Sequence, residues 1–87
     1  MIPRHEVLEG ATACVMRDRN TQHGPPENTF ALIAELWSAY LGTEVQPHDA
    51  AAMMALLKVA RIRHNPANTD NWIDLAGYAA CGGELSP

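Results

Sequence analysis

The chain has 87 residues, a formal net charge of −4 and a pI of about 5.4. We therefore expect one domain, 1–87, without a broad nucleic-acid or anionic-membrane footprint. Hydrophobic residues make up 47% of the chain and charged residues 18%. Because so short a chain buries a limited core, part of its apolar surface is expected to meet a second copy in a homo-oligomer.

The sequence shows no sign of membrane insertion or secretion. No apolar run approaches the roughly 20 residues that a membrane-spanning helix needs, and the N-terminus lacks the apolar core of a signal peptide. The two cysteines, Cys14 and Cys81, fit no metal-ligand spacing. A reduced, cytoplasmic setting without a membrane partner is therefore expected.

Helical spacing of apolar residues predicts a first helix over residues 5–19 and a second over 27–41. The segment between them reads NTQHGPPEN, and its glycine and prolines interrupt a helix. Two interpretations of this segment stay open. It is either a plain connection or one wall of a ligand site, at which His23 and Asn28 offer hydrogen bonds. Gly42 follows the second helix at the position where glycine commonly ends a helix.

The same spacing predicts a third helix over 48–64 and a fourth over 70–81, separated by a turn at Pro66. The apolar stripe of the third helix is expected to be Met53, Leu56, Leu57 and Ala60. The residues of the fourth that are expected to be buried are Trp72, Ile73, Leu75 and Ala76. Gly77 lies inside the fourth helix and predicts a close approach of another segment there.

These elements predict an all-α fold, because no segment shows the alternation of a strand. Short connections between the helices favour antiparallel neighbours, and hence a small antiparallel four-helix domain. Three residues widen the apolar stripes beyond one face, which makes them candidates for the subunit interface of the expected homo-oligomer. They are Trp37, Tyr40 and Met54.

Charged residues on apolar helices mark the candidate site. Asp74 lies in an apolar run, where a carboxylate is costly unless it is paired or bound to a metal. Asn71 shares its helix face, and Lys58 and Arg61 share a face of the preceding helix. One interpretation is a magnesium and phosphate site between helices, to which Glu35 also contributes. The other is internal pairing of Asp74 with Lys58 or Arg61, which fixes the helix register.

The chain reads RNTQHGPPENTFALIAELWSAYLG, then DAAAMMALLKVARI, then DNWIDLAGYAACGGE. From about Met16 to Glu84 it resembles a family of small phage and prophage proteins of unknown function. That family is similar to the all-α nucleotide pyrophosphohydrolases of the MazG-like group. The resemblance implies a MazG-like homo-oligomer that splits nucleoside triphosphates into monophosphate and pyrophosphate. In those enzymes an E-x-x-E motif and a later E-x-x-D motif hold Mg²⁺.

The two motifs fall on Glu35 with Ser38 and on Asn71 with Asp74, so two of the four acids are replaced. Glu35 and Asp74 would then be the catalytic residues and metal ligands, and Asp70 would be a substitute metal ligand. The resemblance thus implies the catalytic roles, at acids whose type already favours a magnesium site.

The expected function is binding of a nucleotide or another phosphate-bearing small molecule, with Mg²⁺-dependent hydrolysis by a metal-activated water. Lys58 and Arg61 would contact phosphates, His23 and Asn28 the base or sugar, and Asn71 would assist. The expected location is the cytoplasm of a phage-infected or lysogenic bacterial host. Two alternatives stay open: a non-catalytic protein that sequesters a nucleotide, and a host-interaction or assembly protein whose acids act only in the structure.

Overall fold

The computed structural model describes residues 2–18 and 26–87, and this part of the chain is helical, without a strand. The elements are the α-helix α1 (Arg4–Ala13), the π-helix η1 (Cys14–Asp18), and the α-helices α3 (Pro26–Leu41), α4 (Pro47–His64) and α5 (Thr69–Leu85). The all-α prediction is confirmed for the described residues, with α1 and η1 together forming the first predicted helix. His23 lies outside the described residues.

The last helix is longer than predicted, because it continues through Gly82 and Gly83 to Leu85. A Cβ atom at position 82 would lie 3.3 Å from the Cβ atom of Ala51 on α4. The close packing of α5 on α4 therefore outweighs the low helix propensity of the glycine pair, which had predicted an end near residue 81.

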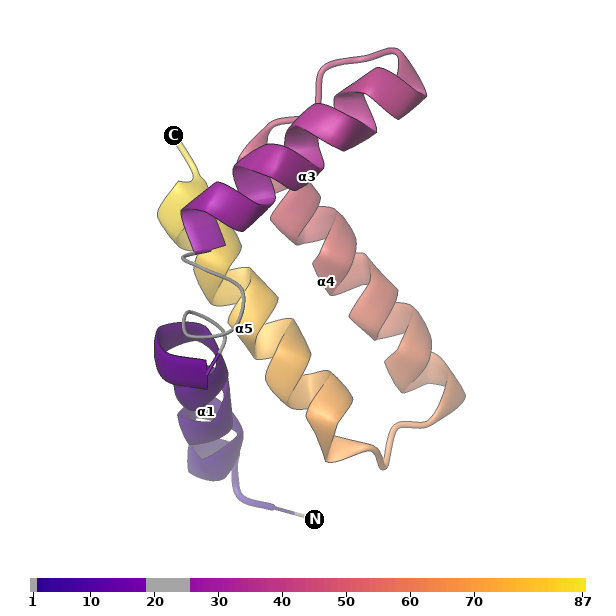
Figure 1. Ribbon diagram of the computed structural model, residues 1–87. Coiled ribbons are helices and arrows are strands. Elements are labelled where there is room, and N and C mark those ends of the chain that lie inside the picture. The colour runs from indigo at the N-terminus through magenta and orange to yellow at the C-terminus, as the bar shows by residue number, and fades with distance from the viewer. Residues whose placement is uncertain (1, 19–25) are drawn as a thin grey trace.

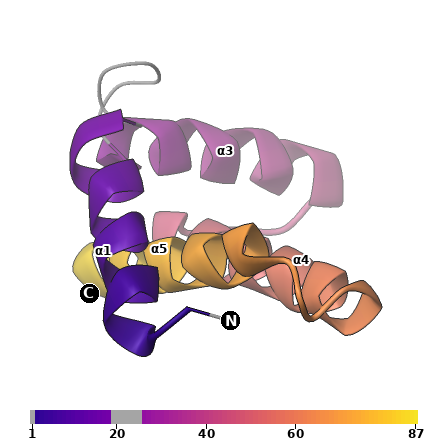
Figure 2. The same ribbon diagram turned by 90° about the horizontal axis from the view of Figure 1, so that it is seen from below.

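The helices form two layers around the α4–α5 pair. Figure 1 shows α4 and α5 joined by the turn at residues 65–68, with α3 crossing the other end of the pair. In Figure 2, which looks from below, α3 lies as a second layer over α4 and α5. The helix α1 packs on α5. The turn end of the pair is therefore left uncovered by α3.

The core lies where α3 crosses α4 and α5. It consists of Phe30, Ala34, Ala50, Ala51, Tyr78 and Cys81. Phe30 is the largest fully buried side chain, and its ring meets the edge of Tyr78 in a T-shaped contact with centroids 6.2 Å apart. Trp37 and Met54, two of the predicted interface residues, pack against this core, whereas the third, Tyr40, is exposed.

The connection between α3 and α4 is fixed by its own polar groups. Gly42 has a positive φ of 71°, as the predicted helix end requires. The Ser38 hydroxyl donates to the carbonyl of Ala34 at 2.7 Å and accepts from the N–H of Val45 at 2.8 Å. Ser38, which occupies the position of the second acid in the E-x-x-E motif, thus holds the connection.

The prediction for the packed face of α4 is wrong. Its expected stripe of Met53, Leu56, Leu57 and Ala60 is exposed, and Leu56 keeps 66% of its surface in solvent. The packed face instead carries Ala50, Ala51, Met54, Ala55 and Lys58. Small alanines let α5 approach α4 closely, and the larger apolar residues therefore lie on the outer face.

Trp72 was expected to be buried and is 44% exposed. Its indole N–H donates to the carbonyl of Pro66 at 2.9 Å, which holds the ring over the turn between α4 and α5. The indole therefore stabilises the turn from outside, in keeping with the amphipathic character of tryptophan.

No helix among the described residues is both long enough and apolar enough to span a membrane.

Candidate functional site

An ion pair ties the middle of α4 to α5. The Nζ atom of Lys58 lies 2.8 Å from Oδ2 of Asp74, with 11% of the Lys58 side chain and 35% of the Asp74 side chain exposed. Desolvating the lysine is costly, and the carboxylate offsets this cost only while the pair is intact. Of the two interpretations of Asp74 that the sequence left open, the structure shows the internal pairing, and it selects Lys58 as the partner.

One helical turn before Asp74, Asn71 occupies an unusual position for an amide. Only 8% of its surface is exposed. Its backbone N–H donates to the carbonyl of Asn68, whereas no side-chain hydrogen bond of Asn71 is found among the described residues. A buried amide is normally hydrogen-bonded. The small exposed part of Asn71 faces the hollow described next, so this amide is available to a ligand there.

A hollow lies at the turn end of the α4–α5 pair, and we call it the turn hollow. It has a volume of about 450 Å³ and is lined by Leu57, Ala60, Arg61, His64, Asn65, Asn68 and Asn71. This volume falls within the roughly 300–1,000 Å³ of small-molecule sites. Amide groups, one guanidinium and one imidazole line its polar side. Such a lining suits an anionic ligand that also accepts and donates hydrogen bonds.

The local fold explains why these groups converge. Arg61 and His64 lie three residues apart in the last turns of α4 and therefore share a face. The side chain of Asn68 caps α5 by accepting from the N–H of Asp70 at 3.1 Å. The turn then returns the chain so that Asn71 faces α4.

The structure brings together only some of the predicted site residues. Arg61 and Asn71 line the turn hollow, and Lys58 is paired with Asp74. Asp70 is exposed in the first turn of α5. Glu35 and Asn28 are exposed on α3, which crosses the opposite end of the α4–α5 pair (Figure 1).

The three predicted metal ligands Glu35, Asp70 and Asp74 do not form one cluster. Within residues 2–18 and 26–87 no three acidic, histidine or cysteine side chains are placed to hold a metal ion. Magnesium binding therefore stays a prediction.

Three residues of the turn hollow were missed from the sequence: His64, Asn65 and Asn68. Residues 65–68 were interpreted only as a turn, and the histidine only as the end of a helix. A signal was present, since three asparagines follow an arginine and a histidine around a proline turn. Polar groups at both sides of one short turn necessarily lie near each other.

Comparison with known proteins gives one family and two relatives. The domain of unknown function DUF6378 matches residues 6–86. The chain is 39% identical over 75 residues to the Gene 55 protein of Mycobacterium phage D29, covering 86% of this chain and 50% of the relative. It is 39% identical over 74 residues to the Gene 55 protein of Mycobacterium phage L5, covering 84% and 47%. No solved structure gives a significant match.

These relatives confirm the predicted resemblance to phage proteins of unknown function. The chain spans about half the length of the curated relatives that it matches. The names of these relatives give no activity, ligand or partner.

Proposed function

The chain belongs to the DUF6378 family, and we propose that it binds a phosphate-bearing small molecule, of the nucleotide class, in the turn hollow. The observation that carries the proposal is the meeting of Arg61 with the buried amide of Asn71 in one hollow of ligand size. The sequence marked both residues as ligand contacts from their types and spacing.

Each group of the hollow has a role in this proposal. The planar guanidinium of Arg61 donates two parallel hydrogen bonds to phosphate oxygens. His64 adds a hydrogen-bond donor. The amides of Asn68 and Asn71 both donate and accept, as the edge of a base or the hydroxyls of a sugar require. Apolar contact comes from Leu57 and Ala60.

In this proposal Lys58 acts through its ion pair rather than as a phosphate contact. Its ammonium group is bound by Asp74 at 2.8 Å, so it holds α4 at the right distance from α5. The ion pair thereby positions Arg61 and Asn71, which lie one turn farther toward the hollow on α4 and α5.

Hydrolysis is the further claim that the MazG-like resemblance implies. Binding needs only the donors of the turn hollow, whereas magnesium chemistry would also need the acids Glu35, Asp70 and Asp74 to meet. Sequestering of a nucleotide without hydrolysis is therefore the form of the proposal that the described side chains support most directly. Four further claims stay predictions. They are the MazG-like antiparallel arrangement, the Mg²⁺-dependent activity, the contacts of His23 and Asn28 with base or sugar, and the location in the host cytoplasm.

We expect Arg61→Ala to weaken binding of nucleoside triphosphates roughly 10- to 100-fold, the loss that follows from removing hydrogen bonds to a charged group. Titration calorimetry with the four ribonucleoside triphosphates, and with pyrophosphate, with and without Mg²⁺, measures the effect. We expect this variant to be as stable as the parent protein, because Arg61 is exposed.

Arg63→Ala is the matched control, since Arg63 is exposed on the same helix and does not line the turn hollow. It should bind as the parent protein does. If both variants lost the same affinity, the loss would come from general charge attraction and not from a contact of Arg61 in the hollow. Absence of binding to the parent protein would overturn the proposal.

The same proposal includes a homo-oligomer, in which two copies of the chain meet through α4. Met53 and Leu56 form an apolar stripe on the outer face of this helix, away from the turn hollow, that no described segment covers. Asp49 lies in the first turn of α4, and Arg63, which does not line the turn hollow, lies in its last turn. Antiparallel pairing of α4 with the same helix of a second copy therefore sets acid against base at both ends while covering the stripe.

We expect Leu56→Glu to convert a dimer into a monomer, because it sets two carboxylates into the apolar seam. Light scattering at micromolar concentration measures the mass. Leu32→Glu is the control, since Leu32 is exposed to a similar degree on α3. A monomeric parent protein, or a dimer that only Leu32→Glu disrupts, would contradict this interface.

A further inference from the structure

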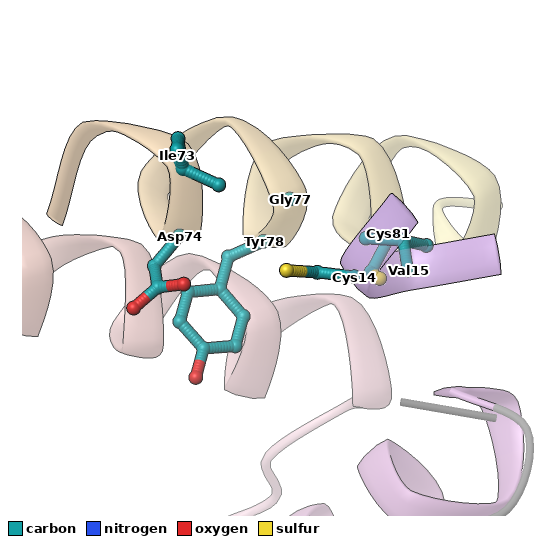
Figure 3. A pocket seen from close by; sticks show the side chains of 7 residues that line it. All are labelled: Cys14, Val15, Ile73, Asp74, Gly77, Tyr78 and Cys81. Carbon is teal, nitrogen blue, oxygen red and sulfur yellow. The ribbon is translucent and has the colours of Figure 1, made fainter. Parts of the chain in front are cut away.

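We propose that Cys14 and Cys81 form a redox-controlled disulfide that fastens the N-terminal helix to α5. Neither cysteine forms a disulfide in the structure. They come from opposite ends of the sequence, yet both line one cavity of about 20 Å³ between η1 and α5 (Figure 3). A space this small, about that of a single water molecule, lies between side chains that are near neighbours.

The backbones approach closely on this side of α5. A Cβ atom at Gly77 would lie 3.2 Å from Cγ2 of Val15, the residue that follows Cys14. Gly77 lies one helical turn before Cys81 and faces the same cavity. The missing side chain thus lets η1 lie against α5. A close backbone approach is the condition for a disulfide, which needs Cα atoms within about 7 Å of each other.

A second close contact holds the preceding part of the chain in the same register. A Cβ atom at Gly10 on α1 would lie 3.0 Å from Cδ1 of Ile73 on α5. These two contacts, at Gly10 and at Gly77, fix α1 and η1 along α5. Cys14 lies in the sequence between Gly10 and Val15, and is therefore held in the same register.

The two thiols differ in access, which sets the order of the reaction. Cys81 is 2% exposed, whereas Cys14 is only partly buried. With oxidised glutathione as the oxidant, the Cys14 thiolate attacks one of its sulfurs, forms a mixed disulfide and releases one glutathione thiolate. The Cys81 thiolate then attacks the Cys14 sulfur and releases the second glutathione. Two protein thiols are oxidised, and one glutathione disulfide is reduced to two thiols.

The bond would act on the N-terminal helix α1 and on η1. The helix α1 packs chiefly on α5, whereas α3, α4 and α5 also share the core. Because the loop closed by the bond contains most of the chain, it strongly constrains the unfolded state. Under reducing conditions the thiols stay separate, and oxidation locks α1 and η1 in place.

The test is oxidation of the purified full chain with defined ratios of oxidised to reduced glutathione. We expect intact mass spectrometry to show the loss of two hydrogen atoms, without added glutathione, and peptide mapping to join Cys14 to Cys81. The melting temperature should rise by roughly 10 °C, and dithiothreitol should reverse the change.

Cys14→Ser and Cys81→Ala serve as paired controls, and each should carry glutathione or stay unmodified without the rise in melting temperature. If Cys81→Ala fails to fold, the comparison of Cys14→Ser with the parent protein still shows whether the rise in melting temperature requires the disulfide. Persistent glutathione on Cys14 in the parent protein, a disulfide between two chains, or a lower melting temperature after oxidation would overturn the proposal.

Discussion

Replacing Phe30 by alanine is expected to lower the free energy of unfolding by about 3–5 kcal/mol, the range found when a buried aromatic ring is removed from a core. Phe30 is 2% exposed and contacts Tyr78 edge to face. The other residues of the buried core are small, apart from Tyr78, and they cannot fill the space that the ring leaves. For a small domain this loss approaches the total stability, since native proteins have only about 5–15 kcal/mol.

Urea unfolding followed by far-UV circular dichroism at one fixed protein concentration measures the effect. The fixed concentration matters because association of two copies would add to the apparent stability. Leu36→Ala is the control on the same helix, because Leu36 is exposed. Its expected change is below about 0.5 kcal/mol in the monomer, as for most surface substitutions. A Phe30→Ala variant as stable as the control would show that the core lies elsewhere.

The helices of this chain could be predicted because their ends carry local signals. Gly42 has the positive φ that its position after α3 predicted, and Asn68 caps α5 as an asparagine before a helix should. These signals act over a few residues and do not depend on the rest of the fold. The end of α5 was missed because Gly82 packs against Ala51, a contact between distant segments that no local pattern contains.

The packed face of α4 could not be chosen from periodicity, because large apolar residues occur all around this helix. Met53, Leu56 and Leu57 suggested one face, while Met54 lies on the other. A helix that is apolar on every side has no single preferred direction. The Lys58–Asp74 pair indicates which face of α4 packs on α5. Two opposite charges on helices that pack together must face each other, and this condition alone turns Lys58, and with it Ala51 and Met54, toward α5.

The candidate site was half predicted for a related reason. Arg61 and Asn71 were found from their types and spacing, and both line the turn hollow. Glu35 was placed with Asp74 through its residue type and a motif, and neither determines where α3 crosses the α4–α5 pair. His64 and Asn68 were missed because His64 ends a predicted helix and Asn68 lies in the turn that follows it, and polar residues are common at both places.

Asp74→Asn is the substitution that best separates a structural from a ligand-binding role of the acid. It removes the negative charge and leaves the Lys58 ammonium, whose side chain is 11% exposed, without its partner at 2.8 Å. Breaking a fully buried pair costs about 3–5 kcal/mol. Because 35% of the Asp74 side chain is exposed, solvent screens part of the interaction, and we expect a loss on the order of 2 kcal/mol.

Thermal unfolding measures this loss as a melting temperature lower by roughly 10 °C for a domain of this size. Glu35→Gln is the matched control, since it removes an acid that is exposed on α3. It should leave the melting temperature within about 2 °C of the parent protein.

The two partners should respond unequally. Lys58→Met removes the more buried charge and keeps an apolar chain of similar length, and the remaining carboxylate can be hydrated through its exposed third. It should therefore cost less than Asp74→Asn, and adding it to Asp74→Asn should restore part of the stability. This recovery is the coupling expected of two residues in direct contact. If Asp74→Asn instead melts like the parent protein, the ion pair contributes little to the fold. Asp74 would then be available for the metal or phosphate site that the sequence predicted, and titration with Mg²⁺ should raise the melting temperature of the parent protein but not that of the variant.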